Sequence, residues 1–407
     1  MSHRTIATHQ APLSARRAWW RLALFAFTIA VAGAEEVVPR ADYEALLARI
    51  AALEARLGTL EQTPAAAPAG SLDEVAGEVR PTALLATIPD RLELGLLVEM
   101  EGTWASHRHR ATGVPAQESD LTLATVELAM GLPLNDWLRA DVVVLFEEDD
   151  TEPPTIDVAT LTLGDPAQTP WSLSVGRQYL PFGSFETALI SDPLTLELAE
   201  TQGTAAVLAY QRETFGLAAG LFNGDAALAD GDEDLRDFVL SGNFTITADW
   251  GTLGGGLGYT SNLANAASLG GEVSAPMAHS VPGVNAYLAL TAGQFTLCGE
   301  HVTATRAVGA GELSFAPAAA TPHPSASSVE LAYAATELLT LATRYQVGHD
   351  LSDWLPEKAL GLGASYCLWQ HGETEALTLS LEYQQASYDD ASDSREHRVT
   401  SQLALAF

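Results

Sequence analysis

The chain has 407 residues, of which 47 % are hydrophobic and 18 % charged, with 20 Lys and Arg against 52 Asp and Glu. Its formal net charge of −32 excludes binding to nucleic acid through the phosphates, which requires clustered cations. Such acidity indicates either a pore that favours cations or the acidic surface of a halophile's protein, and both interpretations stay open. Beyond the N-terminus the hydrophobic residues are scattered and form no run long enough for a membrane helix.

The first 34 residues have the organisation of a secretory signal peptide. Arginines within 16–21 precede the apolar stretch 22–31, which is followed by Ala32-Gly33-Ala34. A positive segment, a short apolar segment and small residues predict cleavage after Ala34. A membrane anchor is the alternative, but the apolar stretch is too short for it. We therefore expect residues 1–34 to be removed and the mature chain to be exported.

Residues 35–70 are predicted to form a periplasmic coiled-coil helix followed by a linker. Apolar residues recur at three- and four-residue spacing in Tyr43, Leu46, Ile50, Leu53, Leu57 and Leu60. This spacing is typical of a coiled coil. Three heptads are too short to associate alone, so we expect them to join chains already held together in a trimer. A lone amphipathic helix lying on another surface is the alternative.

Residues 71–407 are predicted to form an all-β domain, with strands from about residue 91. Apolar and polar residues alternate, as in the segment Leu377 to Tyr383, and short connections alternate with long polar ones. This pattern predicts a sixteen-stranded antiparallel transmembrane β-barrel in the outer membrane of a Gram-negative cell, with short periplasmic turns and long external loops. Merging one hairpin would give fourteen strands. The first two strands are expected at 91–102 and 120–132, and the last at 395–407.

The C-terminus ends in an apolar strand. Val399, Leu403, Leu405 and Phe407 lie on one face, and the chain stops at the aromatic residue. This ending resembles the terminal strand that the barrel-assembly machinery recognises in porins. We therefore expect that machinery as a partner through Phe407, together with outer-membrane lipid and lipopolysaccharide.

Catalytic and metal-binding patterns are missing from the sequence. Cys298 and Cys367 form no C-x-x-C motif, and no G-x-S-x-G motif is present. We expect no enzymatic activity, no metal and no cofactor.

The segment 175–201 reads VGRQYLPFGSFETALISDPLTLELAET. Its GRQ and LPFG motifs, followed by SDP, resemble the LbtU-like siderophore porin family and, more distantly, the phosphate-selective porins. The resemblance implies uptake of an iron-siderophore without the plug domain of a TonB-dependent receptor. The phosphate-selective relatives depend on basic pore linings, whereas this chain has a single lysine, Lys358.

The same segment overlaps the predicted third external loop, 181–203, and the third loop narrows the pore in general porins. Pro181 and Gly183 favour a sharp turn away from the barrel wall. An inward loop would place carboxylates in the lumen, where the walls focus their field. An ordinary capping loop or a subunit contact is the alternative. The candidate pore residues are Glu186, Asp192, Glu197 and Glu200 on the loop and Arg139, Arg344 and Arg398 on the opposite wall.

Three functions remain open from the sequence. The first is a channel or receptor for iron-siderophores or similar small solutes. The second is a general, cation-preferring diffusion porin, and the third is a purely structural outer-membrane barrel.

Overall fold

The computed structural model describes residues 91–108, 115–148, 151, 153–164, 169–229, 235–372, 375–388 and 394–407. The predicted signal peptide and the predicted coiled-coil segment lie outside these residues. Among the described residues, no helix is long and apolar enough to cross a membrane.

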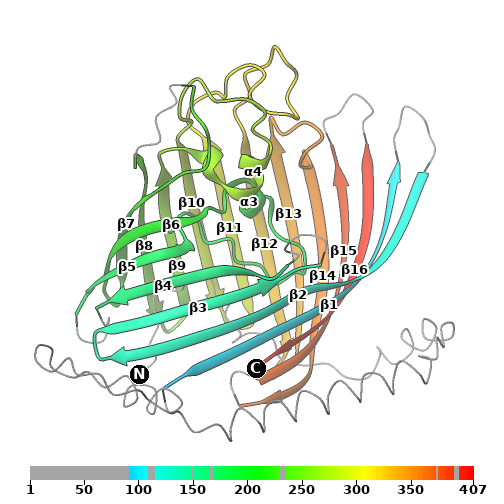
Figure 1. The fold of residues 1–407 in the computed structure, drawn as a ribbon. Helices are drawn as coiled ribbons and strands as arrows, with labels where there is room; N and C mark the ends of the chain where they lie inside the picture. Colours follow the sequence, from blue (N-terminus) through cyan, green and yellow to red (C-terminus); the bar gives the residue numbers. More distant parts are fainter. Residues whose placement is uncertain are drawn as a thin grey trace, which may run out of the picture. The chain divides into compact units, whose positions relative to one another are not determined.

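Sixteen antiparallel strands form a closed barrel, in which each strand pairs with its neighbours in sequence and β1 pairs with β16 (Figure 1). The predicted fold and strand count are confirmed. The strands are β1 (Glu93–Arg108), β2 (Pro115–Asn135), β3 (Leu138–Phe146), β4 (Thr155–Leu163), β5 (Trp171–Tyr179), β6 (Gln202–Gln211), β7 (Phe215–Phe222), β8 (Asp237–Ala248), β9 (Gly251–Thr260), β10 (Gly283–Ala292), β11 (Phe295–Ala304), β12 (Ser325–Thr336), β13 (Leu339–His349), β14 (Lys358–His371), β15 (Glu375–Ser387) and β16 (Arg395–Ala406).

The barrel closes at its C-terminal residue. The amide of Phe407 donates to the carbonyl of Leu96 at 2.9 Å, and the Leu96 amide donates back to Phe407 at 3.1 Å. The Phe407 side chain is 57 % exposed, as are other large apolar side chains on the outer wall. The terminal residue therefore seals the seam between the first and last strands.

The two-residue periodicity separates an apolar outer face from a polar inner face. On β16, Leu403 and Leu405 are each 38 % exposed, whereas Gln402, which lies between Ser401 and Leu403, is 6 % exposed. On β15, Leu381 points outward and is exposed, while Glu382 is buried inside. Water-exposed leucines would be costly, so the outer face requires a lipid environment.

Some predicted boundaries were wrong, because polar residues continue the strands beyond the apolar band. The strand β1 extends to Arg108, and β2 begins already at Pro115, although the sequence suggested a long loop there. Short helices also occur within long connections, namely α3 (Leu194–Ala199), η2 (Leu263–Asn265) and α4 (Ala267–Gly271). Helices of three to six residues are too short to leave a recognisable period in sequence.

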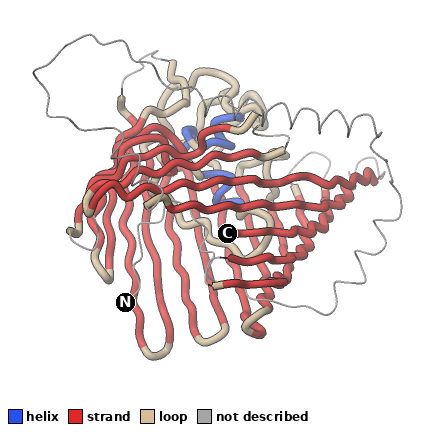
Figure 2. Tube along the Cα trace, turned by 60° about the horizontal axis from the view of Figure 1, so that its bottom comes forward, coloured by secondary structure: helices blue, strands red, loops and turns tan. Residues whose placement is uncertain are grey.

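One side of the lumen is filled by apolar side chains from the long connections and from the adjoining strands. Phe182, Leu198, Leu263, Met277 and Val302 belong to one buried cluster, and each is at most 2 % exposed. The helix α3 contacts β11, β12, β13 and α4, and Figure 2 shows these helices among the loops within the ring of strands. Because this cluster occupies one side of the lumen, a passage for solutes would have to run along the remaining walls.

Candidate functional site

The connection between β5 and β6, residues 180–201, crosses the lumen, and we call it the lumen loop. Its ends are joined where the Leu180 amide donates to the Thr201 carbonyl at 2.9 Å. Gly176, just before it, has a φ of 137°, and a Cβ there would lie 2.0 Å from the Ala159 carbonyl oxygen. Gly183 has a φ of 94° and lets the chain turn inward. The glycines of the GRQ and LPFG motifs thus direct the chain into the barrel.

The first wall contact of the lumen loop is Glu300 on β11. Its carboxylate accepts the backbone amides of Ser184 and Phe185 at 2.8 and 2.9 Å. It also accepts the side-chain amide of Asn285 at 2.7 Å and the hydroxyl of Thr195 at 3.3 Å. One half-buried wall carboxylate therefore holds two separate parts of the loop.

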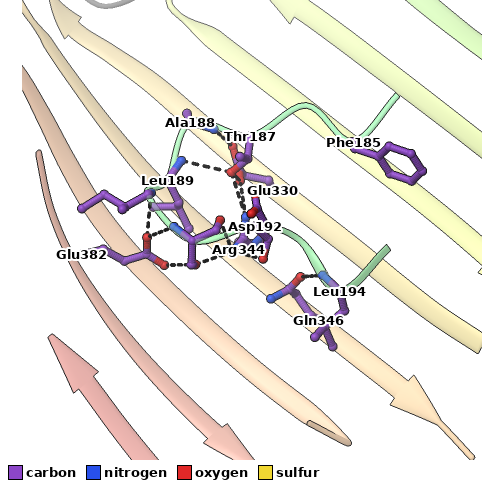
Figure 3. Close-up of polar contacts among 12 residues, drawn as sticks. Phe185, Thr187, Ala188, Leu189, Asp192, Leu194, Glu330, Arg344, Gln346 and Glu382 are labelled. Atoms are coloured by element: carbon purple, nitrogen blue, oxygen red, sulfur yellow. Dashed lines mark hydrogen bonds and ion pairs between the residues drawn. The ribbon is translucent and has the colours of Figure 1, made fainter. Parts of the chain in front are cut away.

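Two further wall carboxylates repeat this arrangement along the loop (Figure 3). Glu330 on β12 accepts the Thr187 hydroxyl and the following backbone amide, both at 2.6 Å. Glu382 on β15 accepts the backbone amides of Ile190 and Ser191 at 2.7 and 2.8 Å. Buried backbone amides need acceptors, and the barrel wall supplies them where the loop has no secondary structure of its own.

Arg344 on β13 lies between these carboxylates and is 1 % exposed. Its guanidinium donates to the Thr187 hydroxyl at 2.8 Å, to the Ser191 hydroxyl at 2.6 Å and to the Asp192 carbonyl at 3.1 Å. Its Nη1 lies 3.7 Å from the Glu330 carboxylate. Figure 3 shows the guanidinium reaching the loop from the wall. The buried cation balances wall carboxylates and holds the loop at the same time.

Glycines on the wall make room for apolar side chains of the lumen loop. A Cβ added to Gly361 or Gly363 on β14 would lie 2.8 or 2.4 Å from Leu189. A Cβ added to Gly258 on β9 would lie 2.9 Å from the Phe182 ring. The loop therefore packs tightly against two separate parts of the wall, at β9 and at β14.

Three loop carboxylates, those of Asp192, Glu197 and Glu200, influence one another. Surrounding protein raises the pKa of Asp192, although the nearby Arg344 guanidinium opposes this effect. Burial and then the Asp192 carboxylate raise the pKa of Glu197. Burial, Asp192 and then Asp157 of β4 raise the pKa of Glu200 to about 7. The three carboxylates therefore form one acidic group that extends toward the β4 wall.

Glu186 lies apart from this acidic group. It is exposed and lines the same small cavity as Tyr287 and Cys298, on the β10 and β11 side of the loop. The structure therefore brings together three of the four predicted loop carboxylates.

Of the three predicted arginines, Arg344 contacts the lumen loop. Arg139 forms ion pairs with Glu93 at 2.7 Å and Asp141 at 2.6 Å, at the periplasmic end of its strand. Arg398 pairs with Glu396 on the same strand at 2.8 Å. These two arginines balance other carboxylates of the wall. Residues that face inward on different strands can lie at different heights in the barrel, so a shared inward face does not bring them to the same loop.

Sequence reasoning missed the wall residues that anchor the loop. Glu300, Glu330 and Glu382 accept its amides, and Gln346 accepts the Leu194 amide at 2.7 Å. The available signal was a large polar residue on an inward face otherwise composed of small residues, such as Glu382 beside Ser380. Within the described ranges, no group of three or more His, Cys, Asp or Glu residues is arranged to hold a metal ion.

A closed sixteen-strand antiparallel barrel of this kind is a porin-like outer-membrane channel fold. The outer-membrane channel DcaP of Acinetobacter baumannii superposes with a TM-score of 0.51 and 13 % identity, over 78 % of this chain and 97 % of that chain. The anion-selective porin of Comamonas acidovorans gives a TM-score of 0.52 and 11 % identity, over 78 % and 99 %. At these identities the likeness concerns the fold.

The curated relatives are named UPF0422 proteins. One from Legionella pneumophila is 25 % identical over 107 residues, which are 24 % of this chain and 20 % of the relative. One from Coxiella burnetii is 21 % identical over 230 residues, which are 52 % of this chain and 48 % of the relative. The chain thus spans less than half the length of these relatives. No protein-family model matches the chain.

Proposed function

We propose that the protein is an outer-membrane diffusion channel whose passage favours cationic solutes. The observation that carries this proposal is the acidic group of Asp192, Glu197 and Glu200 on the lumen loop, beside Asp157 of β4. Other residues of the loop are hydrogen-bonded to the wall and hold it in place. A solute in the remaining passage therefore meets a fixed row of carboxylates.

The electrostatic preference follows from the low-dielectric surroundings of the passage. Two unit charges about 4 Å apart interact by about 4 kcal/mol at an effective dielectric of about 20. A tenfold preference for cations requires only about 1.4 kcal/mol. The fold itself does not set the sign, because the similarly folded Comamonas acidovorans porin is anion-selective.

The second candidate is a route for iron-siderophores. It is supported by the resemblance of segment 175–201 to the LbtU-like siderophore porins, because this segment includes the lumen loop. The acidic lining adds a condition to this candidate. A ferric complex with net negative charge would be repelled, so the cargo would be a cationic or neutral complex.

The test is the reversal potential across planar bilayers under a salt gradient. The variant D192N/E197Q/E200Q should lower the cation-to-anion permeability ratio about tenfold. Wild-type selectivity should weaken with salt, because the Debye length falls from about 10 Å at about 0.1 M to about 3 Å at about 1 M. E186Q alone should have a smaller effect, since Glu186 lies on the other side of the loop.

The matched control removes the same charge from exposed periplasmic turns, in E213Q/D249N/E337Q. It should leave selectivity unchanged. Equal selectivity of the wild type and the lumen variant would reject the cation channel, and absence of conductance would favour a structural barrel. Loss of ferric-siderophore uptake in the lumen variant, with small-solute flux retained, would favour the second candidate.

We further propose export through cleavage of residues 1–34 and assembly as a trimer through residues 35–70. The mass of the mature chain and native mass spectrometry in mild detergent test these two proposals. Retention of residues 1–34 would reject the first, and purely monomeric protein would reject the second.

A further inference from the structure

Cations collect on the outer wall at the external end of β14, β16 and β1. The strand register places Arg108 of β1 directly opposite Arg395 of β16. On the next strands, Arg395 pairs with Ser387 of β15, and Ser387 pairs with Lys358 of β14. Arg108, Arg395 and Lys358 are all exposed and lie in one row of paired residues across these strands. We call these three residues the cationic rim.

The alternation of faces shows that the cationic rim points away from the lumen. Glu396, next to Arg395, is 5 % exposed and faces inward. Val399 and Trp104 share the outward parity of the two arginines and pair with each other across the seam. The rim therefore stands on the outer wall directly above apolar side chains.

The height of the two facing arginines matches the edge of the membrane. Exposed apolar residues on β1 run from Leu94 to Trp104. Ten residues span about 33 Å along a strand, which gives about 25 Å of height at a tilt of about 40°. This equals the apolar band of an outer-membrane barrel. Arg108 lies four residues beyond Trp104, about 10 Å above the band, and a long arginine side chain can bend back to the interface.

The charge of the rim is unusual for this chain, which has 20 Lys and Arg against 52 Asp and Glu. Like charges directly opposite each other on neighbouring strands destabilise a sheet. Lys358, the single lysine, is partly balanced by Glu357 at 2.5 Å. The facing arginines, Arg108 and Arg395, are the part of the rim that an anion would stabilise most.

We propose that the cationic rim binds the phosphate groups of lipopolysaccharide in the outer leaflet. The phosphates of this lipid lie at the boundary of the apolar band, and arginine binds phosphate through paired N–H groups. Trp104 below the rim provides an amphipathic surface for the adjoining acyl chains. The site anchors the seam between the first and last strands to the lipid.

The test compares lipid binding by the full-length protein in a zwitterionic detergent. The variant R108Q/R395Q removes the facing arginines, and R212Q/R306Q removes two exposed arginines from a periplasmic turn and another external loop. Native mass spectrometry with purified rough lipopolysaccharide measures the bound lipid. We expect about 30-fold weaker binding for R108Q/R395Q and no change for the control. A dephosphorylated lipopolysaccharide should bind the wild type as weakly as the variant.

Three results would overturn the proposal. Equal binding by the wild type and R108Q/R395Q is the first. An equal loss in R212Q/R306Q would show that only net charge matters. Unchanged lipid binding with a lower unfolding temperature in R108Q/R395Q would assign the arginines to ion pairs within the chain itself instead.

Discussion

Replacing Arg344 with Met should release the lumen loop while leaving the barrel closed. Methionine keeps much of the side-chain length but removes the donors to Thr187, Ser191 and Asp192. It also leaves Glu330 buried without its cation. Breaking a buried ion pair by removing one partner costs about 3–5 kcal/mol. The strands lose no backbone hydrogen bond, so this cost falls on the attachment of the loop.

This free-energy cost determines how many molecules have the lumen loop released from the wall. A cost of about 3–5 kcal/mol increases that population by about 100- to about 5,000-fold. Hydrogen exchange of the loop amides reports it directly, because those of Ser184, Ala188, Ile190 and Ser191 are bonded to wall carboxylates. Their exchange should accelerate by the same factor. Single-channel currents should also show frequent excursions to a larger conductance.

The matched control is R398M, which removes a lumen arginine whose ion-pair partner is Glu396. It should leave loop exchange and conductance unchanged. Unaltered exchange of the loop amides in R344M would refute the assignment of Arg344 as the residue that positions the loop. Equal acceleration across the strand amides would instead show general loosening of the barrel.

The remaining predictions concern single positions. Because the pKa of Glu200 is raised to about 7, the group gains charge between about pH 6 and about pH 8. Cation preference should rise over that range in the wild type but not in E200Q. The folded state also holds this proton more tightly, so its contribution to the free energy of unfolding falls as pH rises, and E200Q should raise the unfolding temperature at about pH 8 but not at about pH 4. Deletion of Phe407 should lower the yield of the heat-modifiable folded band on gels, while F407Y should retain it. G176A should lower the unfolding temperature, because its Cβ would lie 2.0 Å from the Ala159 carbonyl oxygen.

The fold could be predicted because its physical cause is local. Alternation along each strand records one lipid face and one lumen face, and the turns interrupt it at short intervals. The extension of β1 to Arg108 could not be predicted, because above the apolar band neither face needs apolar residues. The register between Arg108 and Arg395 likewise depends on barrel closure, which joins residues at opposite ends of the chain.

The candidate site was predictable in its loop but not in its anchors. Pro181 and Gly183 mark the inward turn, and the carboxylates of the loop are visible in sequence. Glu330 and Glu382 look like any other inward polar residue, since nothing local distinguishes a carboxylate that accepts loop amides from one that faces water. For the same reason Arg344 and Arg398 were indistinguishable in sequence. Within the residues that the structure describes, Arg344 contacts the lumen loop, whereas Arg398 pairs with Glu396.

The attachment of the lumen loop also constrains the order in which the channel becomes complete. The loop bonds to residues far ahead in the chain, with separations of 116 residues for Ser184 to Glu300, 143 for Thr187 to Glu330 and 192 for Ile190 to Glu382. The loop cannot take its final place until β11 through β15 stand beside one another, and closing such distant contacts is entropically slow. The constriction is therefore a late product of barrel assembly, formed only once the C-terminal strands have supplied its acceptors.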